Sequence, residues 1–216
     1  MKQTVGILGG SGPAGRGVAV RLAKAGTAVI LGSRDSERGI AAAAELGGAA
    51  AGISGGDNAL AASADIVIVA TPWEGSVATV REFKEQLAGK TVISMVNALV
   101  KEGRELVPVM PARGSMLAEI QSAIPTALVT GAFHHLPAAD MENLDSGLDA
   151  DVIVIGDDVA ARRTTVELVN EMPGLRAIEA GSSSLAGAVE AFTAVCISVN
   201  IRHKKHTYVT LAGFDD

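Results

Sequence analysis

The chain has 216 residues, a formal net charge of −6, 48% hydrophobic residues and 19% charged residues. This composition is typical of a globular protein and excludes a disordered chain, and the acidic balance argues against a nucleic-acid-binding protein. The single cysteine, Cys196, excludes an intrachain disulfide. We expect no signal peptide and no membrane-spanning run, so the sequence predicts a cytoplasmic protein without a membrane partner.

Short aliphatic runs alternate with longer amphipathic ones over the first hundred residues. The aliphatic runs predict strands at residues 4–8, 28–31, 65–70 and 91–96, and the amphipathic runs predict helices at residues 13–25, 36–46, 58–63 and 75–87. Strands that are apolar on both faces and alternate with helices are typical of a parallel sheet covered on both sides. The sequence therefore predicts an α/β fold of the Rossmann type, with a doubly wound parallel sheet.

The second half of the chain has a less regular pattern. It predicts helices at residues 115–123 and 159–171, strands at residues 127–130 and 152–155, and a long final helix from about 184 to 203. We expect a Rossmann domain over residues 1–130. Residues 131–216 are expected to form a small C-terminal α/β domain that ends in the long helix and completes a substrate pocket.

The final helix has apolar residues at three- and four-residue spacing, which predicts one buried stripe. The stripe consists of Leu185, Val189, Phe192, Cys196 and Val199. On this pattern Cys196 is a buried structural thiol. Residues 181–184 precede the helix and are suited to capping it. Glu190, Thr193 and Asn200 are polar residues inside the helix that need partners, either protein groups or a bound ring system.

A glycine-rich motif follows the first predicted strand and opens the first predicted helix. It fits G-x-G-x-x-G, in which the glycines permit a tight turn, a close approach to a pyrophosphate and close helix–strand packing. The pyrophosphate then lies at the helix N-terminus. The predicted cofactor-binding residues of this motif are Gly10, Ser11, Gly12, Pro13, Ala14 and Gly15.

The end of the second predicted strand decides which dinucleotide is favoured. An acidic residue at this place holds the ribose hydroxyls of NAD. Here the strand is followed by Ser33 and Arg34, with Arg38 one helical turn later. A hydroxyl and two guanidinium groups suit a 2′-phosphate, and Asp35 can point away. The sequence therefore favours NADP over NAD.

Two further segments lie where a cleft is expected. Thr71, Pro72 and Trp73 follow a central strand, at the edge where doubly wound sheets bind ligands. The indole of Trp73 either walls the cleft or caps the core. His134 and His135 are adjacent and are expected on opposite faces of a strand, so that one lines the cleft, or one is buried and the other exposed. No zinc-type cluster of Cys and His occurs, and no metal site is predicted.

Taken together, these segments resemble the F420-dependent NADP reductases over nearly the full length. The likeness includes residues 9–17, 31–34, 71–74, 132–138, 154–158, 180–181 and 197–200, together with Glu190, Thr193, Lys204 and His206. The Rossmann segments are shared with many enzymes, whereas the Phe133-His134-His135 segment and the last helix are more specific. The resemblance implies a reversible hydride transfer between NADP(H) and the deazaflavin coenzyme F420.

The resemblance also implies roles for particular residues. Ser11, Ser33, Arg34 and Arg38 are expected to hold the NADP phosphates. His134, Leu136 and Pro137 are expected to line the deazaflavin pocket, with His134 as a catalytic residue that stabilises charge on the ring. Ala191 and Thr193 are expected to approach the nicotinamide. The chain departs from the family at Ala191, where a hydroxyl residue occurs in relatives, and in residues 97–113 and 207–216.

Other functions are also consistent with the sequence. Asn200 and Lys204 share a helix face and resemble the proton-donating pair of NADPH-dependent reductases that act on small carbonyl compounds. A flavin reductase or a non-catalytic NADP sensor would use the same Rossmann half. Because symmetric dimers are the commonest assembly, a homodimer is expected.

Overall fold

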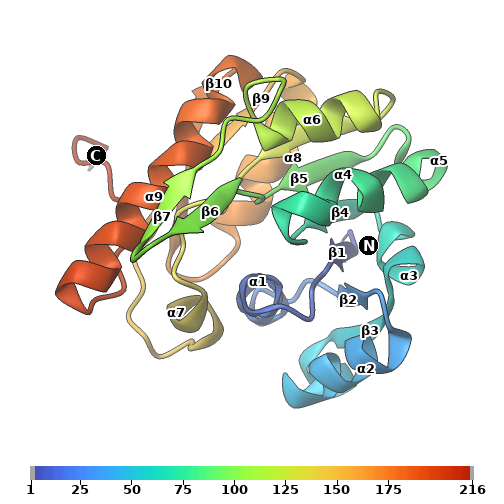
Figure 1. Ribbon diagram of the computed structural model, residues 1–216. Helices are drawn as coiled ribbons and strands as arrows, with labels where there is room; N and C mark the ends of the chain where they lie inside the picture. The colour runs from blue at the N-terminus through green and yellow to red at the C-terminus, as the bar shows by residue number, and fades with distance from the viewer. Residues whose placement is uncertain (1–2, 215–216) are drawn as a thin grey trace.

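The computed structural model describes residues 3–214, and one eight-stranded sheet passes through its centre (Figure 1). The strand order is β10-β9-β8-β5-β4-β1-β2-β3. The strands are β1 (Val5–Leu8), β2 (Val29–Ser33), β3 (Ile53–Asp57), β4 (Ile66–Val69), β5 (Thr91–Ser94), β8 (Leu128–Gly131), β9 (Ala150–Gly156) and β10 (Leu175–Gly181). All neighbours in this sheet pair in parallel except β8 and β9, which pair antiparallel. The predicted Rossmann-type α/β fold is confirmed.

Helices cover both faces of the sheet. They are α1 (Pro13–Lys24), α2 (Ser36–Glu45), α3 (Asn58–Ala62), α4 (Trp73–Glu82), α5 (Lys84–Leu87), α6 (Met116–Ala123), α7 (Ala138–Glu142), α8 (Val159–Asn170) and α9 (Ala186–His203). Side chains of β4 alternate between two hydrophobic clusters, because successive residues of a strand point to opposite faces. Ile66 and Ile68 pack with α1 and α8, whereas Val67 and Val69 pack with α4 and α6.

The sequence pattern missed strand β3 for a physical reason. Its residues include Gly55 and Gly56, and glycine is depleted in strands. The glycines are needed because α2 lies against this strand: a Cβ atom on Gly39 of α2 would come 2.1 Å from the carbonyl oxygen of Gly56. The glycines that allow close helix packing therefore make the sequence of this strand resemble that of a loop.

Four further elements after residue 98 were not predicted. A hairpin of β6 (Leu99–Glu102) and β7 (Glu105–Pro108) turns at Gly103, which has a φ of 61°. Helix α7 is one short turn after Pro137, and β10 is an edge strand that carries charged residues. The predicted domain boundary after residue 130 falls within β8, and β9 and β10 extend the same sheet.

The predicted buried stripe of α9 is wrong except at Val189, which is half-buried and packs against the hydrophobic core. Leu185, Phe192 and Val199 are 44%, 46% and 36% exposed, and Cys196 is half-buried rather than buried. The face that packs into the protein instead carries Ala186, Glu190, Thr193 and Ala194. Periodicity located an apolar face correctly but could not show whether that face meets the core of its own chain.

Two other expectations for this helix need correction. Ser183 does not cap α9, because its N–H and hydroxyl donate to the carboxylate of Asp157 at 3.0 and 2.7 Å. Residues Ser183–His203 are also long and apolar enough to cross a membrane by length and composition, contrary to the expectation of no such run. One face of this segment is nevertheless used for packing against α6, β7 and β9.

Candidate functional site

The carboxyl ends of the central strands form the site. Strand β1 pairs with β2 on one side and with β4 on the other, so the strand order reverses between β1 and β4. In open α/β sheets, ligands bind outside the carboxyl ends of the strands at this reversal. The glycine loop, Thr71 and Asn97 follow β1, β4 and β5 respectively, and Ser33 is the last residue of β2, so all four lie along this edge.

The three glycines of the loop have different structural roles. A Cβ atom on Gly10 would lie 2.7 Å from Cδ2 of Leu31, and one on Gly15 would lie 2.6 Å from Cα of Gly10. Packing therefore requires both glycines. A Cβ atom on Gly12 would meet only the carbonyl oxygen of Gly9, at 3.5 Å. The space beside Gly12 is thus open, as expected where a pyrophosphate approaches the backbone.

The N-terminus of α1 is suited to an anion. Gly12 is its N-cap residue and supplies no side-chain cap, and no acidic residue lies in the first turn. The first N–H groups of a helix have no partner within the helix and carry partial positive charge. The loop geometry therefore fits a phosphate, as the sequence predicted.

Asn58 holds this loop in place, and the sequence did not reveal its role. The buried side chain accepts a hydrogen bond from the N–H of Gly9 through Oδ1, at 3.1 Å. Gly9 itself has a φ of 71°, in the region that favours glycine. Asn58 follows the glycine-containing strand β3, so missing that strand also concealed the residue.

The end of β2 presents two free cations. Arg34 and Arg38 are exposed, and neither guanidinium group has a hydrogen-bond or ion-pair partner within the described part of the chain. The carboxylate of Asp35 instead caps α2, accepting from the N–H groups of Glu37 and Arg38. Asp35 is thus occupied at the start of α2, one of the arrangements that the sequence allowed, and the edge is chemically suited to a 2′-phosphate.

Thr71 and Trp73 lie on the other side of the glycine loop. A Cβ atom on Gly9 would come 2.8 Å from Cγ2 of Thr71, so the two segments touch. The Oγ1 atom of Thr71 is buried without a partner in the described structure, which leaves a polar group for a ligand at the strand reversal. The indole of Trp73 is half-buried and donates to the carbonyl of Leu99 at 3.1 Å. Trp73 thus connects α4 to the β6–β7 hairpin, while Pro72 is exposed.

Both histidines after β8 are buried, so the alternative in which one of them is exposed is wrong. They lie in a turn rather than on a strand, after Phe133 with a φ of 66°. The Nε2 atom of His135 lies 2.7 Å from the carbonyl oxygen of Val189 on α9. Since a carbonyl can only accept, this atom carries the proton.

The ring of His134 is neutral and fixed in one tautomer. Asn97 donates through Nδ2 to the carbonyl of His134, so its Oδ1 faces the imidazole and accepts from Nδ1–H at 2.9 Å. Burial, with a smaller effect from His135, lowers the pKa of His134 to about 3. Nε2 is then an unprotonated acceptor, buried without a partner among the described groups. In this arrangement His134 offers a ligand neither positive charge nor a free N–H.

The buried imidazole makes a prediction about acid stability. The pKa of His134 is lower in the folded protein than in the unfolded chain, so the neutral imidazole contributes to the free energy of unfolding. This contribution is fully present above about pH 6.5 and is lost as the pH falls toward 3. Between about pH 7 and pH 5, this loss amounts to about 2 kcal/mol for His134. We expect H134N to remove that share of the acid dependence, measured as the difference in free energy of unfolding between the two pH values.

Other titrating groups do not confuse this measurement. Burial raises the pKa of Glu190 to about 7. The contribution of this carboxyl group to the free energy of unfolding therefore falls as the pH rises above the pKa of Glu190 in the unfolded chain, which is opposite to the effect of His134. Glu190 and His135 are present in both proteins, so their effects cancel in the comparison. H203Q, at an exposed position, is the control. An acid dependence in H134N equal to that of the wild type would contradict the assignment.

Helix α9 brings Thr193 and Glu190 to the site. The hydroxyl of Thr193 donates to the carbonyl of His134 at 3.0 Å, so two predicted site residues meet here. Glu190 accepts from the N–H groups of Met116 and Leu117, at 2.7 and 2.9 Å, and so satisfies the first turn of α6. Its partners are protein groups, one of the two alternatives left open by the sequence.

Ala191 lines a cavity of about 80 Å³ between α9 and the hairpin. The other lining residues include Ala98, Met110, Gly187 and Glu190. The segment 97–113, which departs from the family pattern, therefore forms one wall of a cavity whose other wall is α9. Leu136 and Pro137 are half-buried at the start of α7. Their contact with a ligand stays a prediction.

Asn200 and Lys204 do not form a proton-donating pair in this fold. Oδ1 of Asn200 accepts from the N–H and the hydroxyl of Thr207, both at 2.7 Å. Lys204 is exposed and ends α9 with a φ of 52°. Their spacing serves the turn into the C-terminal tail. Burial raises the pKa of the Cys196 thiol, which disfavours the nucleophilic thiolate form.

Known proteins resemble this chain in sequence and in fold. A family model described as NADP oxidoreductase, coenzyme F420-dependent, matches residues 4–98. The F420-dependent NADP reductase of Methanocaldococcus jannaschii is 34% identical over 211 residues, 93% of each chain. That of Methanothermobacter thermautotrophicus is 29% identical over 215 residues, covering 94% of this chain and 92% of the relative. A solved structure from Arthrobacter sp. FB24 shares the fold, with a TM-score of 0.83, 24% identity, and 97% and 100% of the two chains covered. The chain belongs to the family of F420-dependent NADP reductases, a family of NADP-dependent oxidoreductases.

Proposed function

We propose that the protein transfers a hydride reversibly between NADP(H) and the deazaflavin coenzyme F420. The observation that carries the proposal is the 34% identity to a reductase of this specificity over 93% of both chains. The site supports it, because the open space beside Gly12, the free guanidinium groups of Arg34 and Arg38 and the unpartnered hydroxyl of Thr71 fit a dinucleotide with a 2′-phosphate.

The protein's own contribution is binding and alignment. Nicotinamide and deazaflavin rings both carry hydride and supply the redox chemistry when bound. Gly12 and the first turn of α1 would hold the pyrophosphate, with Ser11 nearby, while Ser33, Arg34 and Arg38 would hold the 2′-phosphate. Thr193 and Ala191 would adjoin the nicotinamide, and His134, Leu136 and Pro137 the deazaflavin. Effective transfer needs the two reacting carbons in contact and shielded from water.

The test is to mix the protein with NADPH and oxidised F420 and follow the loss of deazaflavin absorbance. NADH in place of NADPH, and FMN or a small ketoacid in place of F420, serve as matched controls. Bleaching with NADPH and much less with NADH supports the proposal. Saturable NADPH binding without bleaching rejects it, and turnover of FMN or the ketoacid then identifies a flavin or carbonyl reductase. No turnover with any acceptor identifies an NADP-binding sensor.

We also propose that the protein is a homodimer that covers the outer face of α9. Phe192, Val195 and Val199 of α9 share this face with Leu185 at its N-cap, and the four are 36–50% exposed, which is unusual for large apolar residues on one face. Beside it runs a groove of about 300 Å³ between α9 and β7, lined by Leu106, Val195, Val199 and others. A second copy related by a two-fold axis would bury these faces against each other.

The proposed dimer predicts the effect of polar substitutions on this face. We expect V195S/V199S to weaken association by about a hundredfold, since it removes apolar contacts from the interface. Light scattering over a dilution series measures the change in mass. The control is I40S, at a residue of α2 that is 54% exposed and lies outside the face. A wild-type protein that is monomeric at every concentration would contradict the proposal.

A further inference from the structure

Helix α7 lies directly against α1, the helix that begins at the nucleotide loop. It starts immediately after Leu136 and Pro137, the residues assigned above to the deazaflavin pocket. A Cβ atom on Gly17 of α1 would come 2.5 Å from Cβ of Met141 and 3.1 Å from the carbonyl oxygen of Ala138. Only a residue without a side chain lets the two helices approach this closely.

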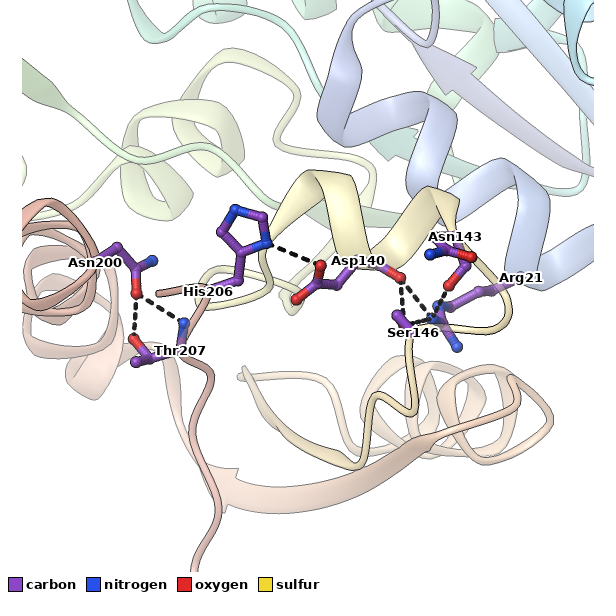
Figure 2. A network of polar contacts seen from close by, with 7 residues as sticks. All are labelled: Arg21, Asp140, Asn143, Ser146, Asn200, His206 and Thr207. Atoms are coloured by element: carbon purple, nitrogen blue, oxygen red, sulfur yellow. Dashed lines mark hydrogen bonds and ion pairs between the residues drawn. The ribbon is translucent and has the colours of Figure 1, made fainter. Parts of the chain in front are cut away.

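A buried arginine anchors α7 to α1. The guanidinium of Arg21, only 2% exposed, points from α1 to the end of α7 and the loop that follows it (Figure 2). It donates to the carbonyl oxygens of Met141 at 3.0 Å, Asp140 at 2.7 Å, Pro173 at 2.6 Å and Asn143 at 3.3 Å, and to Oγ of Ser146 at 3.3 Å. Burying this cation has a desolvation cost, which the five hydrogen bonds offset. Because these bonds are directional, they hold α7 and the loop after it in a specific position.

A second arginine reaches α7 from a place even closer to the glycine loop. Arg16 directly follows Gly15, and its guanidinium binds both carboxylate oxygens of Glu142, through Nε at 3.2 Å and Nη2 at 2.9 Å. Its Nη1 atom binds Glu45 of α2 at 2.6 Å. One side chain thus joins the nucleotide loop to α7 on one side and to α2 on the other.

The C-terminal tail closes on the opposite side of α7. Nδ1 of His206 lies 2.9 Å from a carboxylate oxygen of Asp140, and Asn200 holds the tail through Thr207 (Figure 2). Helix α7 is therefore held by α1 on one side and by the tail on the other. A five-residue helix has little stability of its own, so these contacts determine where it lies.

We propose that Arg21 and Arg16 are positioning residues that set α7, and with it the Leu136–Pro137 wall, against the nucleotide-binding helix. Neither guanidinium needs to touch the reacting atoms. The α1–α7 contact then joins the loop that binds the NADP pyrophosphate to the wall of the deazaflavin pocket, and so helps to set the distance between the two bound rings. This inference rests on the proposed function only where it assigns Leu136 and Pro137 to a deazaflavin pocket.

The test compares R21K and E142A with the matched control E45A, which breaks the other ion pair of Arg16. In the protein without ligands, R21K and E142A are expected to speed amide hydrogen exchange of residues 136–143 by about tenfold, and E45A to leave it unchanged. In turnover with NADPH, R21K and E142A are expected to raise KM for F420 by about fivefold and KM for NADPH by less than about twofold.

Unchanged exchange in both variants would overturn the proposal, and so would an equal rise of both KM values. If the wild-type protein binds NADPH but does not reduce F420, the proposed function fails, while hydrogen exchange still decides whether the two arginines position α7. The variant G17A provides a second route, because it pushes on α7 from α1 without removing a charge. It is expected to speed the same exchange, and normal exchange in G17A would contradict close helix contact.

Discussion

Replacing Gly12 with alanine is expected to leave the fold intact and to weaken NADPH binding by about a hundredfold, or about 2.8 kcal/mol. The nearest protein atom to the added methyl group is the carbonyl oxygen of Gly9 at 3.5 Å, so the substitution causes no steric clash in the folded state. It does occupy the space through which a pyrophosphate would approach the backbone at the start of α1. Calorimetric titration with NADPH and thermal unfolding without ligand measure the two effects separately.

Gly15→Ala is the matched control, because it makes the same chemical change three residues away. Its methyl group would lie 2.6 Å from Cα of Gly10, in contact with backbone that cannot yield easily. We expect G15A to lower the free energy of unfolding by about 1–3 kcal/mol, beyond any gain from the better helix propensity of alanine. A G12A protein that binds NADPH like the wild type would show that no pyrophosphate lies beside Gly12.

The contrast between these glycines shows what a sequence motif can and cannot reveal. The motif, the first strand and the first helix lie within 20 residues, and local sequence was enough to predict them. The motif does not say which glycine faces a ligand and which faces the protein. That distinction depends on Leu31 and on the path of the loop, and only the structure provides it.

Features that depend on distant contacts could not be predicted. In the sequence, Arg16 and Arg21 are ordinary charged residues of an amphipathic helix. Apart from Glu45, however, their partners lie between 119 and 152 positions further along the chain. The hydrogen bonds of Asn97 and Thr193 to the main chain of His134 likewise join three segments that the sequence shows separately. Such polar anchors have no periodicity that a sequence analysis can detect.

The last helix presents a different difficulty, because its apolar pattern is clear but is consistent with two kinds of packing. An apolar stripe predicts that a face is removed from water, but not whether the same chain or another copy covers it. In α9 the covered face is the one with Glu190 and Thr193, whose polar groups are satisfied by main-chain partners. The apolar face points outward, which is why it supports a proposal about assembly rather than about the core.

The double variant R34A/R38A is expected to remove most of the preference for NADPH over NADH. Each guanidinium is exposed and has no protein partner in the described chain, so its removal costs the fold little. A hydrogen bond to a charged group contributes about 1.5–3 kcal/mol, and two of them to a 2′-phosphate would account for a hundredfold or larger loss of NADPH affinity, about 2.8 kcal/mol or more. NADH lacks that phosphate, so its affinity is expected to change by less than about threefold.

The measurement is the ratio of dissociation constants for NADPH and NADH, in the variant and in the wild type. R81A, at an exposed arginine of α4, removes a positive charge away from the end of β2 and controls for a general loss of attraction to an anion. If the guanidinium groups act only through their charge, the NADPH affinity of R34A/R38A recovers in R34K/R38K. If they act as planar, two-pronged donors, lysine restores only part of it, because an ammonium group cannot bind two phosphate oxygens in the same way. An unchanged ratio in R34A/R38A would place the 2′-phosphate elsewhere and leave Ser33, buried beside the same strand end, as the next residue to replace.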